Sequence, residues 1–171
     1  MTMSKTVIHK ATRDDLETIA EFLDECWRFS YRDIITDESL DKMQVPERHR
    51  RLLERYDAAA SDFLMMLDGD LLIGVAAFGE PTIEGYKDDG EVTAIYLQKD
   101  YIGRGYGHFL LTEIEQALAA KGYADYVLDV LQANTQAIRF YQAHGYEKVA
   151  ESTFTLGDTE YPLDVMRKSK T

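Results

Sequence analysis

Three glycines at alternate positions separate a strand-like pattern from a helix-like pattern in the stretch IYLQKDYIGRGYGHFLL, residues 95–111. Glycine weakens regular elements, but it is favoured where the backbone turns unusually or where another group approaches closely. Gly103, Gly105 and Gly107 therefore predict a tight connection between a strand and the start of a helix. The first N–H groups of a helix lack partners and the helix dipole is positive there, so this connection is suited to hold a phosphate.

Two common nucleotide-binding motifs do not match this stretch. A dinucleotide fingerprint requires G-x-G-x-x-G, whereas the chain reads G-R-G-Y-G without a third glycine at the right spacing. A P-loop requires Lys and then Ser or Thr after its last glycine, whereas His108 and Phe109 follow Gly107.

Strand and helix patterns follow one another along the whole chain. The expected elements are a strand at 6–10, a helix at 12–29, a helical region at 37–60 interrupted before Pro46, strands at 63–67 and 71–79 around a turn at 68–70, a strand at 91–97, a helix at 107–123, a strand at 125–131, a helix at 134–146 and a hairpin at 147–168. This order predicts an α/β fold of the α+β type, with a mixed central sheet of about six or seven strands flanked by about four helices.

Amphipathic spacing predicts the buried helix faces. In the helix at 107–123 the residues expected to face inward are Phe109, Leu110, Ile114, Ala117 and Leu118. Cys26, the single cysteine, lies on the apolar face of the helix at 12–29 and is expected in the core rather than as a nucleophile.

Length and composition indicate one domain, residues 1–171, with 45% hydrophobic residues. No apolar run reaches ~18 residues, and the N-terminal stretch lacks the apolar segment of a signal peptide, so we expect no membrane association and a cytoplasmic location. The net charge of −12 argues against nucleic acid as a partner and favours cationic ones. The four histidines show no metal-ligand spacing, and no metal is expected.

A second block completes the pattern N-x-x-A-x-x-x-Y-x-x-x-G-[FY], supplied by Asn134, Ala137, Tyr141, Gly145 and Tyr146. Together with the glycine stretch, it makes the chain closely resemble the GNAT superfamily of acetyl-CoA-dependent N-acetyltransferases. The resemblance covers roughly residues 63–168 and implies that this part is the acetyl-CoA-binding core, with the helices at 13–60 on the acceptor side. One departure is Ile102, which stands where the family's loop has Gln or Arg. We expect the site to survive, because it binds largely through main-chain N–H groups.

The resemblance also assigns roles. Tyr141 is expected to protonate the leaving CoA thiolate. Glu91 is expected to act as the base through water, with Glu80 and Glu84 as alternatives. The residues expected to bind acetyl-CoA are Ile95, Tyr96, Leu97, Ile102, Gly103, Arg104, Gly105, Tyr106, Gly107 and Asn134. Asn134 is equally suited to cap the helix that follows it.

The acceptor pocket is expected at Trp27 and Tyr31, with Tyr86 and Tyr161 as further candidate walls. Aromatic rings together with carboxylates suit an ammonium group, so a small cationic amine, polyamine-like or amino-sugar-like, is the expected acceptor. Acetylation of a protein α-amino group or lysine, a non-catalytic acetyl-CoA-binding module and a plain interaction domain are the alternatives. Homodimers are common in similar proteins, so a homodimer is a further expectation.

Overall fold

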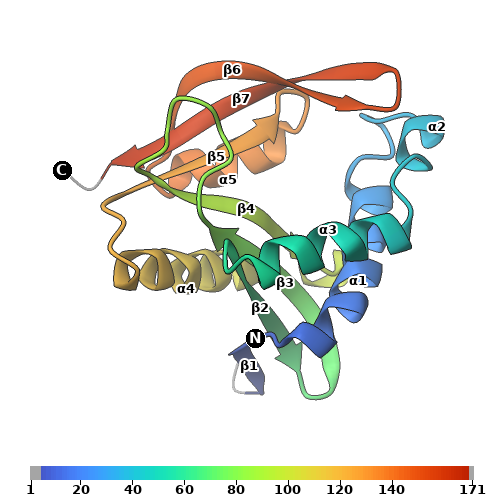
Figure 1. Ribbon diagram of the computed structural model, residues 1–171. Coiled ribbons are helices and arrows are strands. Elements are labelled where there is room, and N and C mark those ends of the chain that lie inside the picture. Colours follow the sequence, from blue (N-terminus) through green and yellow to red (C-terminus); the bar gives the residue numbers. More distant parts are fainter. Residues whose placement is uncertain (1–4, 170–171) are drawn as a thin grey trace.

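The computed structural model describes residues 5–169 of the 171-residue chain, and its centre is one seven-stranded sheet (Figure 1). The strands are β1 (Thr6–Lys10), β2 (Ser61–Asp68), β3 (Leu71–Gly79), β4 (Gly90–Leu97), β5 (Asp125–Leu131), β6 (Glu147–Leu156) and β7 (Thr159–Ser169). Their spatial order is β1-β2-β3-β4-β5-β7-β6. All neighbours are antiparallel except β4 and β5, so the expected mixed sheet is confirmed.

Five α-helices and two 3₁₀ turns lie within the described residues, against the four helices expected. The elements are η1 (Arg13–Asp15), α1 (Leu16–Ser30), α2 (Asp37–Leu40), α3 (Val45–Asp57), η2 (Lys99–Tyr101), α4 (Tyr106–Ala120) and α5 (Thr135–Ala143). The helical region at 37–60 is divided as expected, but Pro46 lies inside the first turn of α3. Proline is tolerated there because that N–H has no helical partner. None of the described helices is long and apolar enough to cross a membrane.

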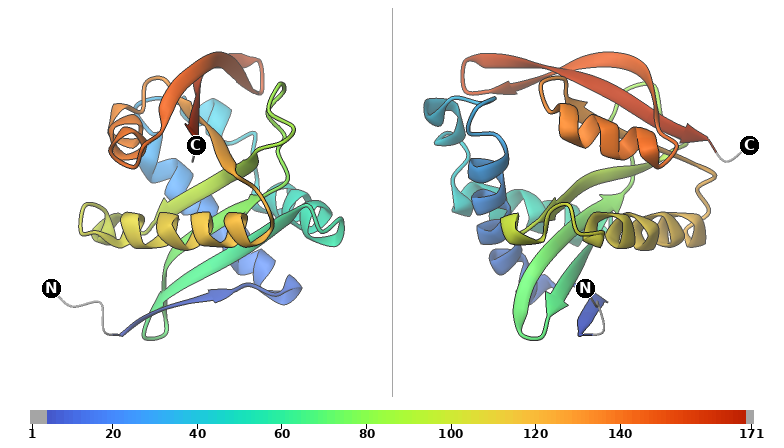
Figure 2. Two further views of the ribbon diagram at one scale, coloured as in Figure 1. Left: turned by 90° about the vertical axis from the view of Figure 1, so that its left-hand side faces the viewer. Right: turned by 180° about the vertical axis from the view of Figure 1, so that it is seen from behind.

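The helices cover both faces of the sheet because alternate strand residues point to opposite sides (Figure 2). On β3, Ala76 packs with the apolar side of α4, whereas its neighbour Val75 packs with the apolar side of α1. The stripe of α4 that is buried consists of Tyr106, Leu110, Leu111, Ile114 and Leu118. The prediction for Phe109 was wrong: its side chain is 42% exposed, because it lies beside this stripe and not on it.

The parallel neighbours β4 and β5 pair over only two positions and then separate. Gly90 faces Tyr126 and Glu91 faces Val127, and no pairing follows although both strands continue. On the other side of β4, Thr93 has no counterpart on β3, because the pairing shifts between Phe78–Val92 and Ala77–Ala94. Such a bulge bends a strand. The separation leaves one edge of β4 open within the sheet.

Candidate active site

A cavity of about 680 Å³ occupies the opening between β4 and β5. It is bordered by α1 and the segment after it, by the loop before α4 and by α5. Many of the residues predicted from the sequence meet here although they come from distant parts of the chain. Those that line the cavity are Trp27, Tyr31, Ile95, Tyr96, Leu97, Ile102, Gly103, Gly105, Gly107, Asn134 and Tyr141.

The glycine loop borders one end of this cavity. Gly103 and Gly105 have φ angles of 79° and 91°, a left-handed conformation that side chains other than glycine rarely adopt. Gly105 is the N-cap of α4, so the unpaired N–H groups of the first helical turn belong to the residues that follow it. The loop therefore presents main-chain donors at the positive end of a helix dipole, which suits a phosphate.

Gly107 has a packing role as well. A Cβ atom at this position would lie 3.2 Å from the ring of Phe140 on α5, which is closer than side chains normally pack. Glycine thus allows α4 and α5 to approach each other beside the cavity.

Two residues of the predicted loop do not line the cavity. Tyr106 is 3% exposed and belongs to the core. Arg104 donates from Nη1 to the carbonyl of Asp100 at 2.9 Å and stacks over the ring of Tyr101 at 5.1 Å.

The open edge of β4 forms a second wall through Ile95, Tyr96 and Leu97. In an antiparallel pair, the main-chain groups of a strand point alternately towards its partner and away from it. The groups of β4 that point away from β3 face the opening, because β5 does not pair with them there. Asn134 lies at the cavity and also caps α5, since its side chain accepts a hydrogen bond from the N–H of Ala137 at 3.3 Å.

Tyr141 on α5 lines the cavity. Burial raises the pKa of Tyr141, and the charges of Tyr31 and Asp129 raise it further. The hydroxyl group is therefore protonated at neutral pH and able to donate its proton.

Glu91, the predicted base, lies outside the cavity lining. The residue is 3% exposed, and its Oε1 accepts hydrogen bonds from the main-chain N–H and the hydroxyl of Thr82 at 2.6 and 2.9 Å. Glu80 and Glu84 do not line the cavity either.

Asp129 on β5 is the carboxylate that lines the cavity, and the sequence analysis did not identify it. The residue is exposed to solvent at the opening. Nearby protein still desolvates its carboxyl group and so raises the pKa of Asp129 to about 6, and the negative charge of Glu91 adds to the effect. A carboxylate with a raised pKa that lies in a cleft is a candidate base. The signal in the sequence was one charged residue inside the apolar strand DYVLDVL.

Aromatic side chains form the end of the cavity near α1. The ring of Trp27 makes edge contacts with Tyr31 and Phe154 at centroid distances of 5.5 and 5.8 Å. The hydroxyl groups of Tyr31 and Tyr96 lie 2.6 Å apart and join α1 to β4. The two other predicted wall residues, Tyr86 and Tyr161, do not line the cavity.

Arg48 on α3 lies against this aromatic end. Its guanidinium is 4.4 Å from the centre of the Trp27 ring, and the residue is 7% exposed. Its Nε has no hydrogen-bond partner among residues 5–169. Burial lowers the pKa of Arg48.

Cys26 is buried as predicted, and its thiol donates to the carbonyl of Leu97 at 3.6 Å. Burial raises its pKa to about 12, so the thiol is a poor nucleophile at neutral pH. Within the described part of the chain, no three potential metal ligands cluster closely enough to hold an ion.

The comparisons with known proteins agree on one family. The model of the acetyltransferase (GNAT) family matches residues 16–146. An uncharacterized N-acetyltransferase of Bacillus subtilis strain 168, YuaI, is 29% identical over 149 residues, which are 87% of this chain and 84% of that protein. A spermidine N(1)-acetyltransferase of Thermoplasma acidophilum is 26% identical over 148 residues, 82% of this chain and 87% of that protein.

Solved structures show the same fold. The PaiA N-acetyltransferase of Thermoplasma acidophilum, crystallised with coenzyme A, superimposes with a TM-score of 0.77 at 24% identity and covers 99% of both chains. The acetyltransferase yncA of Salmonella typhimurium, crystallised with acetyl-CoA, gives a TM-score of 0.72 at 18% identity and covers 98% of this chain and 95% of its own.

Proposed function

Because the chain belongs to the acetyltransferase (GNAT) family, we propose that this N-acetyltransferase moves an acetyl group directly from acetyl-CoA to a small cationic primary amine. The observation that carries the proposal is the cavity itself, where a glycine loop, the open edge of β4, Tyr141 and Asp129 converge. Acetyl-CoA supplies an activated thioester.

The glycine loop and β4 are proposed to hold acetyl-CoA. The N–H groups at the start of α4 bind its phosphates, and Gly103 and Gly105 supply the left-handed turns that bring the backbone close to them. Main-chain groups of Ile95 to Leu97 bind the pantetheine arm and donate to the thioester oxygen, where negative charge develops. Asn134 is proposed to contact the same arm while it caps α5.

Two groups are proposed to move protons. An alkylamine resembles lysine, with a pKa near ~10, so it must lose a proton before it can attack. Asp129, largely ionised at neutral pH because its pKa is about 6, accepts that proton directly or through water. A bond then forms between the amine nitrogen and the acetyl carbon as the carbon–sulfur bond breaks, and Tyr141 gives its proton to the departing sulfur. Glu91, the base expected from the sequence, acts in this proposal by raising the pKa of Asp129.

The aromatic end and Asp129 support a cationic acceptor. The rings of Tyr31 and Phe154, and that of Trp27, which already contacts the guanidinium of Arg48, can contact an ammonium group, and Asp129 supplies a negative charge. The net charge of −12 attracts cations to the molecule as a whole. The relative that acts on spermidine is consistent with this class of acceptor.

The test is thiol release from acetyl-CoA with a panel of polyamines, aminoglycosides, amino acids and short peptides. We expect turnover with a cationic small amine, strongly slowed in Tyr141→Phe. Turnover with peptides alone would assign protein acetylation instead. Tight acetyl-CoA binding without turnover on any acceptor class would indicate a non-catalytic module.

A further inference from the structure

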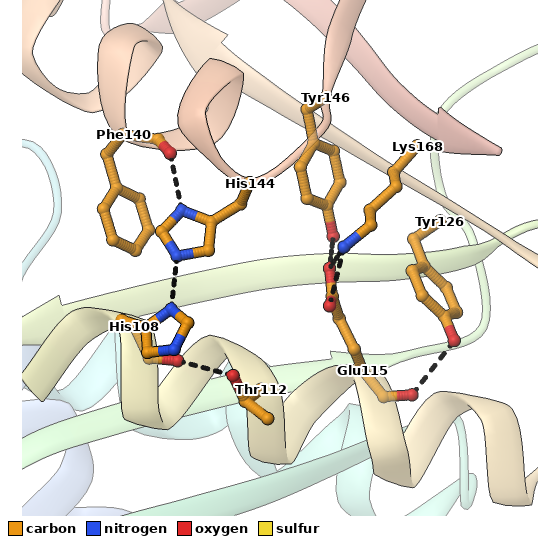
Figure 3. Close-up of polar contacts among 8 residues, drawn as sticks. All are labelled: His108, Thr112, Glu115, Tyr126, Phe140, His144, Tyr146 and Lys168. Carbon is orange, nitrogen blue, oxygen red and sulfur yellow. Dashed lines mark hydrogen bonds and ion pairs between the residues drawn. The ribbon is translucent and has the colours of Figure 1, made fainter. Parts of the chain in front are cut away.

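Two histidines that are 36 positions apart in the chain meet at the glycine-loop end of the cavity (Figure 3). Nδ1 of His108 lies 2.7 Å from Nε2 of His144, and both residues line the cavity. His108 is in the first turn of α4, directly after Gly107, and His144 is the C-cap of α5. The pair joins the two helices beside the proposed phosphate site.

The contacts show which nitrogens of the two imidazole rings carry a hydrogen. Nδ1 of His144 lies 2.8 Å from the main-chain carbonyl oxygen of Phe140, which can only accept, so this nitrogen carries a hydrogen. A neutral His144 then offers Nε2 as an acceptor, and Nδ1 of His108 must donate to it. This leaves Nε2 of His108 as the ring nitrogen without a hydrogen-bond partner within residues 5–169.

The surroundings do not neutralise a charge on this pair. Among the described residues no carboxylate forms an ion pair with either ring, and the Phe140 ring lies 4.5 Å from that of His144. The charged side chains of α4, α5 and the loop before α4 are Glu113, Glu115, Arg139, Lys99, Asp100 and Arg104. Glu115 already binds Lys168 and Tyr146 (Figure 3).

We propose that His108 binds a phosphate of the co-substrate as an imidazolium and that His144 positions it. Nε2 of His108 takes a proton from solvent when the phosphate binds, keeps it, and donates a hydrogen bond to a phosphate oxygen. Nδ1 of His108 keeps its bond to His144, whose own Nδ1 is anchored on Phe140. Histidine gains a proton near neutral pH more readily than any other unperturbed side chain, and a charged donor strengthens a hydrogen bond to phosphate. This inference rests on the proposed use of acetyl-CoA.

Calorimetric titration with CoA and with pantetheine, which lacks the adenosine and all phosphates, tests the pair without an acceptor. In the variant His108→Asn, the amide nitrogen can donate a hydrogen bond from about the position of Nδ1, but the side chain cannot carry a charge. We expect His108→Asn to bind CoA about tenfold more weakly, equivalent to about 1.4 kcal/mol, and pantetheine as the wild type does. Titrations in buffers of different ionisation enthalpy are expected to show proton uptake on CoA binding in the wild type and less in the variant.

Two further variants complete the experiment. His144→Phe keeps a ring but removes the acceptor, and we expect it to weaken CoA binding by a smaller factor than His108→Asn. His9→Asn, on the exposed strand β1, is the matched control and is expected to change neither titration. Unchanged CoA affinity in His108→Asn, or an equal loss for CoA and pantetheine, would overturn the phosphate role. A wild-type chain that binds neither compound would overturn the proposed function itself.

Discussion

The negative charge of Glu91 raises the pKa of Asp129, which lines the cleft, whereas the carboxylate of Glu91 is held outside the lining by Thr82. The two acidic groups therefore have different surroundings. In the proposed mechanism Asp129 exchanges a proton with the substrate in the cavity, and Glu91 changes how readily it does so. The sequence alone assigns the role of base to Glu91. The structure favours Asp129 as the base, with Glu91 raising its pKa, and kinetics can test this division.

Asp129→Asn is expected to lower kcat/KM by about a hundredfold, because general bases typically contribute this much or more. In the wild type, activity should fall below about pH 6 as Asp129 becomes protonated, and the variant should lack this fall. Glu91→Gln removes a nearby negative charge, so it should lower the pKa of Asp129 and shift the fall to lower pH. The measurement is kcat/KM from pH 4.5 to 9. The opposite pattern, with Glu91→Gln inactive and Asp129→Asn active, would return the role of base to Glu91.

Asp129→Asn should also stabilise the fold at neutral pH. The pKa of this carboxyl group is higher in the folded chain, about 6, than its ordinary value of 3.8, so folding favours the protonated form. The stabilisation of the fold that comes from the protonated carboxyl group is fully present below about pH 3.8, and it is lost as the pH rises through about 6. The free energies of unfolding of variant and wild type should therefore differ more at pH 7 than at pH 4. Urea unfolding at both values measures this, and a variant less stable at pH 7 would contradict it.

The proposed proton donor, Tyr141, gives a third prediction. Tyr141→Phe removes the phenolic hydroxyl but keeps the ring that packs against Phe140 and Tyr146 at 5.4 and 5.8 Å. We expect kcat to fall by about a hundredfold with little change in stability. Tyr161→Phe removes a hydroxyl outside the cavity and serves as the control. Equal effects of the two substitutions would show that Tyr141 has no special role.

Local patterns predicted most of the secondary structure, but they could not show how the elements separate. The turn at Asp68–Asp70 and the strand at 125–131 follow from turn chemistry and apolar runs and were correct. The opening between β4 and β5 depends on where pairing stops, and no residue pattern marks that point. For this reason Asp129 was missed, although Tyr141 and Asn134 were predicted to lie at the site through their motif. The meeting of His108 and His144 likewise depends on the packing of α4 against α5.

A partly buried network on α4 gives a stability prediction. Glu115 accepts a hydrogen bond from Tyr146 at 2.8 Å and pairs with Nζ of Lys168 at 3.0 Å, which links α4 to β7 (Figure 3). Lys168→Met leaves a poorly solvated carboxylate with one partner fewer, and we expect it to cost about 1–3 kcal/mol of unfolding free energy. Arg51→Met breaks a more exposed pair with Glu47 and should cost less than about 1 kcal/mol. If thermal unfolding gave similar losses of stability for Lys168→Met and Arg51→Met, burial would not explain the value of the Glu115–Lys168 pair.

Arg48 offers a test of the charge of the acceptor. Its guanidinium lies 4.4 Å from the Trp27 ring, and Trp27 lines the aromatic end of the cavity. A positive charge there opposes the binding of a cation, because burial weakens its screening by water. Arg48→Met keeps a long side chain without the charge, so KM for a cationic amine should fall, by about threefold to tenfold, with kcat nearly unchanged. Stability should change little, since an arginine whose buried Nε lacks a hydrogen bond gains little from its charge. Arg50→Met, on the exposed side of α3, is the matched control. A rise in KM for the same amine would mean that Arg48 attracts an anionic part of the acceptor, and the proposed class would then be wrong.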